Sequence, residues 1–224
     1  MIHMNTFIIA FRATLVTLVL TGLVYPLVVT GLAQVVFPHR ANGSIVVDDK
    51  GREVGSELIG QGFTDAAYVR PRPSSTGYDA ANSGGTQLGT TSKKLRDGTP
   101  DDPATKDTDE SFTGVKDLAA AFRADNELPA GVDVPADAVS RSASGLDPHV
   151  SPETAMLQAP RIAKARGVAV DRIQGVIAAY TEGRELGFIG EPRVNVLAVN
   201  LALDRQFGRP AHVATDGGTL GKRP

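Results

Sequence analysis

Apolar residues are concentrated in one long run near the start of this chain. Residues 13–37 contain no ionisable side chain apart from the phenol of Tyr25. A helix of about 20 apolar residues crosses the hydrocarbon core of a bilayer, so the run predicts a transmembrane helix. The alternative is a cleaved signal peptide with a small-residue site at Gly31 to Ala33. A signal peptide has a shorter apolar region of about 7–15 residues, which favours a retained anchor.

Small and hydroxyl-bearing residues form a stripe along this predicted membrane helix. The stripe predicts contact with partner helices, because such residues allow membrane helices to pack closely. The alternative is that the threonine hydroxyls bond to the backbone of their own helix. Pro26 removes one amide donor and is expected to kink the helix. The predicted partner-helix contacts are Thr14, Thr17, Thr21, Gly22 and Pro26.

Basic residues on the two sides of the apolar run are few. Arg12 and the amino terminus precede it, and Arg40 follows it. The slight excess before the run predicts that residues 1–12 form a cytoplasmic tail. Long following domains translocate largely regardless of charge, so residues 38–208 are expected to form one extracytoplasmic domain.

The pattern after the apolar run predicts an α+β protein, with a single transmembrane helix followed by one domain of mixed helices and strands. Residues 44–51 and 53–59 predict a hairpin, because β-branched residues lead into an Asp-Asp-Lys-Gly turn. Residues 194–207 fit either a strand or a helix, and the helix with Asn195 as its cap is preferred. Three further segments predict helices from apolar spacing, caps and Pro or Gly positions: 112–124, 152–166 with Ser151 as N-cap and an interruption at Pro160, and 170 to a stop at Gly183.

Gly, Pro, Ser and Asn dominate residues 60–88, which therefore predict a long loop. Its aromatic residues predict an ordered loop that serves as the main contact surface of the domain. The contact residues expected there are Phe63, Tyr68, Arg72 and Ser74. Residues 95–110 are polar and charged, which predicts a mobile surface insertion, and residues 209–224 predict a disordered tail.

Composition and motifs exclude several function classes. The net charge of −2 and the pI near 6.1 do not indicate nucleic-acid binding. The chain has no Cys, and its four His residues do not have metal-ligand spacing, so no metal site is predicted. Ser92 and Lys94 are the least unsuitable pair for a membrane-anchored hydrolase, but no positioned base accompanies them. An extracytoplasmic ligand-binding domain is another alternative to the assignment that follows.

Several short motifs, in order along the chain, resemble the C subunit of the Kdp potassium-transporting ATPase. They span about residues 20–207, and their combination is specific although each motif is weak alone. The insertion at 95–110, Gly62 and Ala159 depart from the usual pattern of that family. The motifs are VYPL within the apolar run, ANGS at 41–44, LIGQGF at 58–63, Tyr68 with RPS at 72–74, SGG at 83–85, SASGLD at 142–147, VSP at 150–152, QAPRIAKAR at 158–166, VNV at 194–196 and NLALD at 200–204.

This resemblance implies a non-catalytic accessory subunit in the cell membrane. Its implied partners are a potassium-channel-like subunit and a P-type ATPase subunit, and its implied role is a catalytic chaperone that raises the affinity of the pump subunit for ATP. The Asp-Lys-Thr-Gly-Thr motif of P-type pumps is absent from the chain, so ATP is expected to be hydrolysed elsewhere. No tightly bound cofactor is expected, although ATP could act through the complex. An extracytoplasmic domain cannot touch cytoplasmic ATP, and with the opposite orientation the first nucleotide candidates are Gln158, Arg161 and Lys164.

Overall fold

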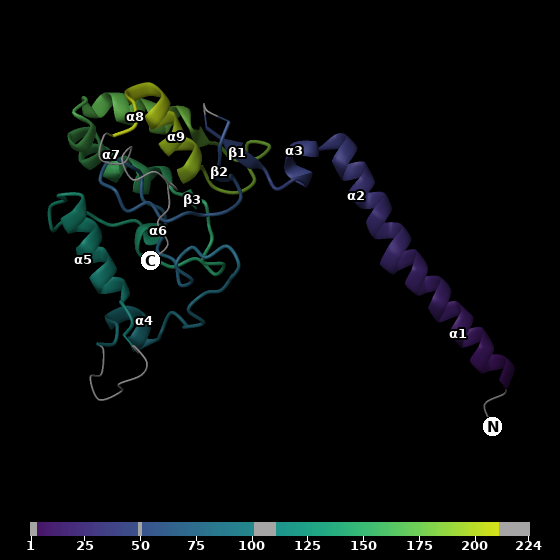
Figure 1. Cartoon of the computed structure of the whole chain (residues 1–224). Helices are drawn as coiled ribbons and strands as arrows, with labels where there is room; N and C mark the ends of the chain where they lie inside the picture. The colour runs from purple at the N-terminus through teal and green to yellow at the C-terminus, as the bar shows by residue number, and fades with distance from the viewer. Residues whose placement is uncertain (1–3, 49–50, 101–110, 211–224) are drawn as a thin grey trace. The chain divides into compact units, whose positions relative to one another are not determined.

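The computed structural model describes residues 4–48, 51–100 and 111–210, which fall into two compact units, Met1–Ile45 and Val46–Pro224. The first unit is dominated by one continuous helix from Met4 to Val36, long and apolar enough to cross a membrane by length and composition (Figure 1). None of its most apolar window is buried within the chain. The elements of this unit are α1 (Met4–Val19), η1 (Leu20–Val24), α2 (Tyr25–Val36) and α3 (Pro38–Ala41).

The helix passes Pro26 through a π-helical turn. In η1 the amide of Tyr25 donates to the carbonyl of Leu20, five residues back. Proline has no amide hydrogen, and in a regular helix its ring would collide with the carbonyl four residues earlier. The wider turn just before Pro26 accommodates this residue within a continuous helix. Pro26 therefore changes the local winding, and a neighbouring helix is not needed to explain the geometry.

The second unit contains the mixed helices and strands that the sequence predicts, so the α+β class is confirmed. β1 pairs with β2, while β5 lies between β3 and β4 in a second sheet in which both pairings are antiparallel. The strands are β1 (Ile45–Val47), β2 (Glu53–Ser56), β3 (His149–Val150), β4 (Thr181–Glu182) and β5 (Arg193–Asn195). The helices are α4 (Lys93–Asp97), α5 (Val115–Asp125), α6 (Ala136–Val139), α7 (Pro152–Arg166), α8 (Val170–Ala179) and α9 (Val196–Phe207).

Local signals fix the ends of α7. The Ser151 hydroxyl accepts a hydrogen bond from the amide of Thr154 at 3.1 Å, which confirms the predicted cap. The helix continues through Pro160 and stops at Gly167, whose φ of 65° lies in the left-handed region that glycine favours. Pro160 therefore does not end the helix, as it was expected to do. It lies inside one continuous helix.

The next two elements correct the predicted boundaries. α8 ends at Ala179 rather than continuing toward Gly183, because Thr181 and Glu182 pair with β5. Residues 194–207 combine both predicted alternatives, since β5 occupies the start and α9 the rest. The side chain of Asn195 accepts from the amide of Ala198 at 3.0 Å and so caps α9.

The core lies where α7, α8 and α9 pack together with β3 and β5. Its buried side chains are mostly Ala, Val, Leu and Ile, with the rings of Phe63 and Tyr68 supplied by the long loop. The fully buried residues include Ile162, Ile173 and Leu203. A core of this composition matches a chain with no Trp and 5% aromatic residues.

The start of the predicted insertion at 95–110 is ordered. Residues 95–97 belong to α4, and Thr99 pairs with Phe112 through two backbone hydrogen bonds of 2.8 and 2.9 Å. Gly98 has φ 79°, and a side chain there would meet the carbonyl of Phe112. The prediction of a mobile insertion is corrected for these residues, while 101–110 lie outside the described residues, as do 1–3 of the predicted cytoplasmic tail and 211–224.

Candidate functional site

The long loop at residues 60–88 contains neither helix nor strand, as predicted, but its aromatic anchors point into the domain. Phe63 and Tyr68 are 3% and 2% exposed, and their ring centroids lie 5.7 Å apart. They order the loop by joining the core. The expectation that these two rings serve an outward contact surface is therefore corrected, because neither ring reaches the surface.

Two buried amide side chains hold the loop backbone as a neighbouring β-strand would. Asn200 of α9 accepts from the amide of Val69 at 2.8 Å and donates to the carbonyl of the same residue at 2.9 Å. Gln158 of α7 does the same with Arg70, at 2.8 and 3.2 Å. Both amide side chains are 1% exposed. The extended segment is thus bonded from two helices, which satisfies backbone groups that burial would otherwise leave without partners.

Two arginines of α7 complete this arrangement. Arg161 donates to the carbonyls of Ala66 at 2.6 Å and Tyr68 at 3.1 Å. Arg166 donates to the carbonyl of Ala67 at 2.8 Å, lies over the Tyr68 ring and pairs with Asp204 at 2.8 Å. We call the side chains that hold residues 66–70 the clamp: Gln158, Arg161, Arg166 and Asn200.

The three predicted nucleotide residues have partners within the chain. Arg161 also donates to Gln158 and Asn126, at 2.7 and 3.0 Å. Burial and the nearby charge of Arg70 lower its pKa to about 10. Lys164 is exposed and forms an ion pair with Glu127. α7 thus brings Gln158 and Arg161 together, but their polar groups are occupied by the loop.

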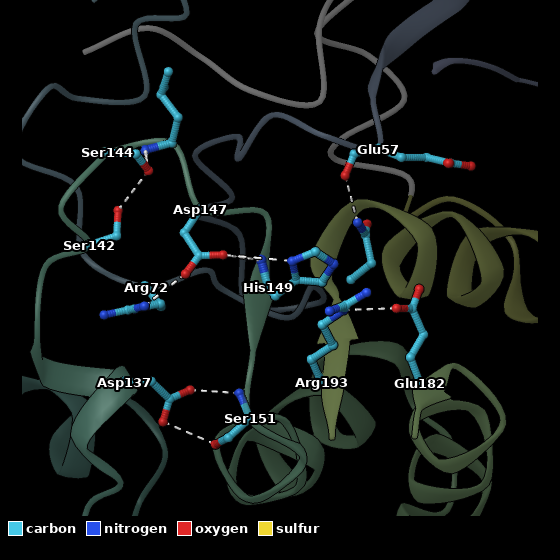
Figure 2. A network of polar contacts seen from close by, with 12 residues as sticks. Glu57, Arg72, Asp137, Ser142, Ser144, Asp147, His149, Ser151, Glu182 and Arg193 are labelled. Atoms are coloured by element: carbon cyan, nitrogen blue, oxygen red, sulfur yellow. Dashed lines mark hydrogen bonds and ion pairs between the residues drawn. The ribbon is translucent and has the colours of Figure 1, made fainter. Parts of the chain in front are cut away.

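The predicted contact residue Arg72 belongs to a second polar network. Its guanidinium pairs with Asp147 at 2.7 Å and also bonds to Ser140. Asp147 accepts from the amide of His149 at 3.0 Å, and Figure 2 shows Arg72, Asp147 and His149 converging. Burial opposes ionisation of Asp147, but hydrogen bonds from His149 and Arg72 outweigh it and lower the pKa of the carboxyl to about 2. The network therefore ties the loop to the segment before β3 through an ion pair.

The segment 142–147 receives further polar contacts of the loop. Ser74 donates to the carbonyl of Gly145 at 2.6 Å, and the amide of Gly60 donates to the carbonyl of Leu146 at 2.8 Å. Any side chain at Gly60 would meet the Asp147 carbonyl at 2.6 Å, so glycine is required by this close approach. A hollow of about 560 Å³ lies here, lined mainly by Leu58, Ile59, Arg72, Ser142, Ser144 and Asp147.

Other candidate chemistry is not assembled in the described part of the chain. Among residues 4–48, 51–100 and 111–210, no group of three or more His, Asp or Glu residues could hold a metal ion. The hydroxyl of Ser92 caps α4 by accepting from the amide of Leu95, and Lys94 lies over the ring of Phe112. The Ser92 and Lys94 side chains of the alternative hydrolase assignment thus have structural roles.

On the apolar helix, two threonine hydroxyls bond to their own backbone. Thr17 donates to the carbonyl of Ala13, and Thr21 donates to the carbonyl of Thr17 at 2.7 Å. Thr14 and Gly22 are exposed on the same helix. The hydroxyl groups therefore bond to the backbone of their own helix, which is the alternative given above. Contact with partner helices stays a prediction, and it now rests on the small size of these side chains.

The sequence interpretation missed a projecting apolar turn. The β4–β5 hairpin ends in residues 184–191, here called the hairpin tip, where Leu186 and Phe188 are 83% and 72% exposed. The clamp residues Arg166 and Asn200 were also not singled out, because their partners are distant in sequence. A Leu-Gly-Phe-Ile run flanked by charged residues was the signal that could have identified the tip.

Comparison with known proteins places these features in one family. Residues 7–205 match the sequence model of the family described as K+-transporting ATPase, c chain. A potassium-transporting ATPase KdpC subunit from Myxococcus xanthus is 55% identical over 210 residues, covering 91% of this chain and 90% of that protein. KdpC subunits from Geobacter metallireducens and Mycobacterium tuberculosis are each 46% identical, over 90% and 88% of this chain and 98% and 96% of those proteins. The chain therefore belongs to the KdpC family, and it is an accessory subunit of a K+-transporting ATPase complex, with one candidate transmembrane helix among the residues that the structure describes.

Proposed function

We propose that this chain stabilises the Kdp complex and raises the affinity of the pump subunit for ATP without contacting ATP itself. The observation that carries this proposal is the clamp: Gln158 and Arg161 use their polar groups to hold residues 66–70. A nucleotide seated there would have to displace buried hydrogen bonds, each of which costs about 1–3 kcal/mol when broken without replacement. An effect on ATP through the membrane helices requires no such rearrangement.

The ATP proposal has a direct test in the assembled complex. Removing the chain should raise the ATP concentration that gives half-maximal K+-stimulated ATPase activity, whereas Lys164→Ala should leave it unchanged. Lys164 suits this test because its side chain is 71% exposed, so its loss does not disturb the core. A photoreactive ATP analogue should label the pump subunit and not this chain. Labelling within residues 158–164 would refute the proposal.

The proposed partners are the channel-like and P-type ATPase subunits, and the proposed contact is the small-residue stripe on the apolar helix. Because Thr17 and Thr21 already bond to their own backbone, their contribution to docking is attributed to size. Changing both to Leu should reduce recovery of the complex in mild detergent. Changing both to Val, which removes the hydroxyls but keeps the shape, is the matched control and should preserve recovery. Equal loss in both variants would favour hydroxyl bonding instead.

The proposed location is the cell membrane, with the amino terminus in the cytoplasm and the domain outside. The absence of Cys allows single-cysteine labelling of the chain. In intact cells, a membrane-impermeant maleimide should label Ala130→Cys, an exposed position, and should not label Asn5→Cys. The opposite pattern would reverse the topology and would make direct contact with ATP feasible.

A further inference from the structure

The hairpin tip exposes apolar side chains that no other part of the described chain covers. Leu186, Phe188 and Ile189 are 83%, 72% and 48% exposed at one turn. Isolated exposed apolar residues are common, but three large ones gathered at a projecting turn indicate a contact site.

The backbone of the turn makes the choice of leucine unusual. Leu186 and Gly187 have φ values of 53° and 82°, and the amide of Phe188 donates to the carbonyl of Glu185 at 3.2 Å. Two positive φ values at the central positions are typical of a type I′ turn, in which Asn-Gly is strongly preferred. Leucine there is both conformationally unfavourable and exposed to water. Such an outlier suggests that its side chain has a role outside the folded chain.

Part of the backbone of the tip is bonded within the turn. The amide of Ile189 donates to the carbonyl of Glu185, and the amide of Glu185 donates to the carbonyl of Ile189, both at 2.9 Å. The amide of Gly187 donates to the carbonyl of Arg184 at 3.1 Å. Behind the turn, Arg184 pairs with Glu191 at 2.7 Å and Arg193 pairs with Glu182 at 2.9 Å. The tip therefore combines exposed apolar side chains with charged side chains that already have partners.

Chain connectivity limits the distance between the apolar helix and the first strand of the domain. Asn195 at the end of β5 donates to the carbonyl of Glu57 at 2.8 Å, so the base of the hairpin lies beside the residue that follows β2. Only residues 37–44 connect α2 to β1, and an extended chain spans at most about 3.6 Å per residue. The linker therefore limits how far β1 can lie from the end of the apolar helix.

We infer that the hairpin tip inserts Leu186, Phe188 and Ile189 into the interfacial region of the lipid bilayer, as a second membrane contact beside the apolar helix. The interfacial region accepts apolar side chains, and its water and headgroups can bond the backbone groups of a turn. Because the flanking charges of the tip are paired, the tip does not require anionic lipid. This inference rests on the proposed membrane anchoring of the helix.

The absence of Trp from the chain allows a direct test with the full-length protein in phosphatidylcholine nanodiscs. In Phe188→Trp, quencher groups attached to the lipid acyl chains should reduce fluorescence, whereas aqueous acrylamide should have little effect. Val170→Trp, at an exposed position of α8, is the matched control and should show the reverse. Leu27→Trp in the apolar helix should be quenched by the lipid. If it is not quenched, the proposal that the apolar helix anchors the chain in the membrane is wrong.

A second variant separates lipid contact from folding. Leu186→Asn in the Phe188→Trp background places a residue that favours the turn while removing one apolar side chain. The ratio of lipid-contacting to water-exposed tips should fall by about tenfold, and the melting temperature should not decrease.

Two outcomes would overturn the inference. In the first, the tryptophan introduced by Phe188→Trp is quenched by acrylamide and not by lipid, while that of Leu27→Trp is quenched by lipid. The inference that the hairpin tip contacts lipid is then wrong, although the apolar helix does lie in the membrane. In the second, the tryptophan at the tip is protected from acrylamide only when the other Kdp subunits are added, which would assign the tip to a protein partner.

Discussion

The clamp around residues 66–70 and the hairpin tip at 184–191 use their side chains in opposite ways. The clamp consists of polar and charged residues, the types that usually suggest a binding site, yet their hydrogen bonds are made within the domain. The tip carries three large apolar side chains, a type that usually indicates a core, yet they are exposed. Residue type alone therefore misassigns both regions. What distinguishes them is whether each side chain already has a partner in the folded chain.

The largest expected effect follows from removing one amide of the clamp. Asn200→Leu keeps the approximate volume of the side chain but leaves the amide and carbonyl of Val69 buried without partners. Each such group costs about 1–3 kcal/mol, so the free energy of unfolding should fall by about 2–6 kcal/mol. Denaturant unfolding of the full chain in detergent measures this loss. Asn82→Leu, at an exposed position of the same loop, is the matched control and should change stability little.

A smaller and pH-dependent effect is expected at Asp147. Its pKa is lowered from 3.8 to about 2 in the folded chain, so the ionised carboxyl stabilises the fold above pH 4, and this contribution is lost as the pH falls from about 4 to 2. At about 1.4 kcal/mol per pKa unit the contribution is roughly 2 kcal/mol, less any solvent screening of a side chain that is partly exposed.

Asp147→Asn tests this contribution directly. The variant should be less stable than the unmodified chain at pH 6, because Arg72 loses its charged partner. The difference between the two proteins should shrink as the pH falls toward 2, where the native carboxyl becomes protonated. A difference that stays constant from pH 6 to pH 2 would show that folding does not lower the pKa of Asp147.

Tyr68→Phe should have a still smaller effect. The phenol donates to Asp204 at 2.9 Å, and burial together with that carboxylate raises the pKa of the phenol. Asp204 keeps its bond to Arg166 in the variant, so the change removes one hydrogen bond and leaves no buried charge alone. The expected loss in unfolding free energy is about 0.5–1.5 kcal/mol. Tyr180→Phe, at an exposed position, serves as the control, and an equal loss in both would argue against the Asp204 bond.

The predictable parts of this fold are those encoded over a few neighbouring residues. The cap, proline and acid at 151–153 identify the start of α7, and Asn195 identifies the start of α9. The apolar helix is evident from its length alone. These signals act within one or two helical turns, so periodicity and capping rules detect them without knowledge of the tertiary structure.

The parts that could not be predicted depend on contacts between distant residues. Asn200 and Val69 are 131 residues apart, and only the folded core shows that one bonds to the other. β3, β4 and β5 are two or three residues long, too short for an alternating pattern to be visible. Phe63 and Tyr68 were correctly identified as anchors of the loop, but the side on which they anchor it depends on the packing of α7 and α9.

The smallest expected change in stability is at the tip, and it contrasts most directly with the clamp. Leu186 has φ 53°, a conformation in which asparagine is less strained than leucine, and its side chain makes little contact with the domain. Leu186→Asn should therefore leave the free energy of unfolding unchanged or raise it by up to about 1 kcal/mol, when measured in detergent without a bilayer. A clear loss would mean that Leu186 stabilises the fold through packing. An unchanged or higher stability would mean that the reason for a leucine at this turn lies outside the folded chain, because the residue does not support the fold.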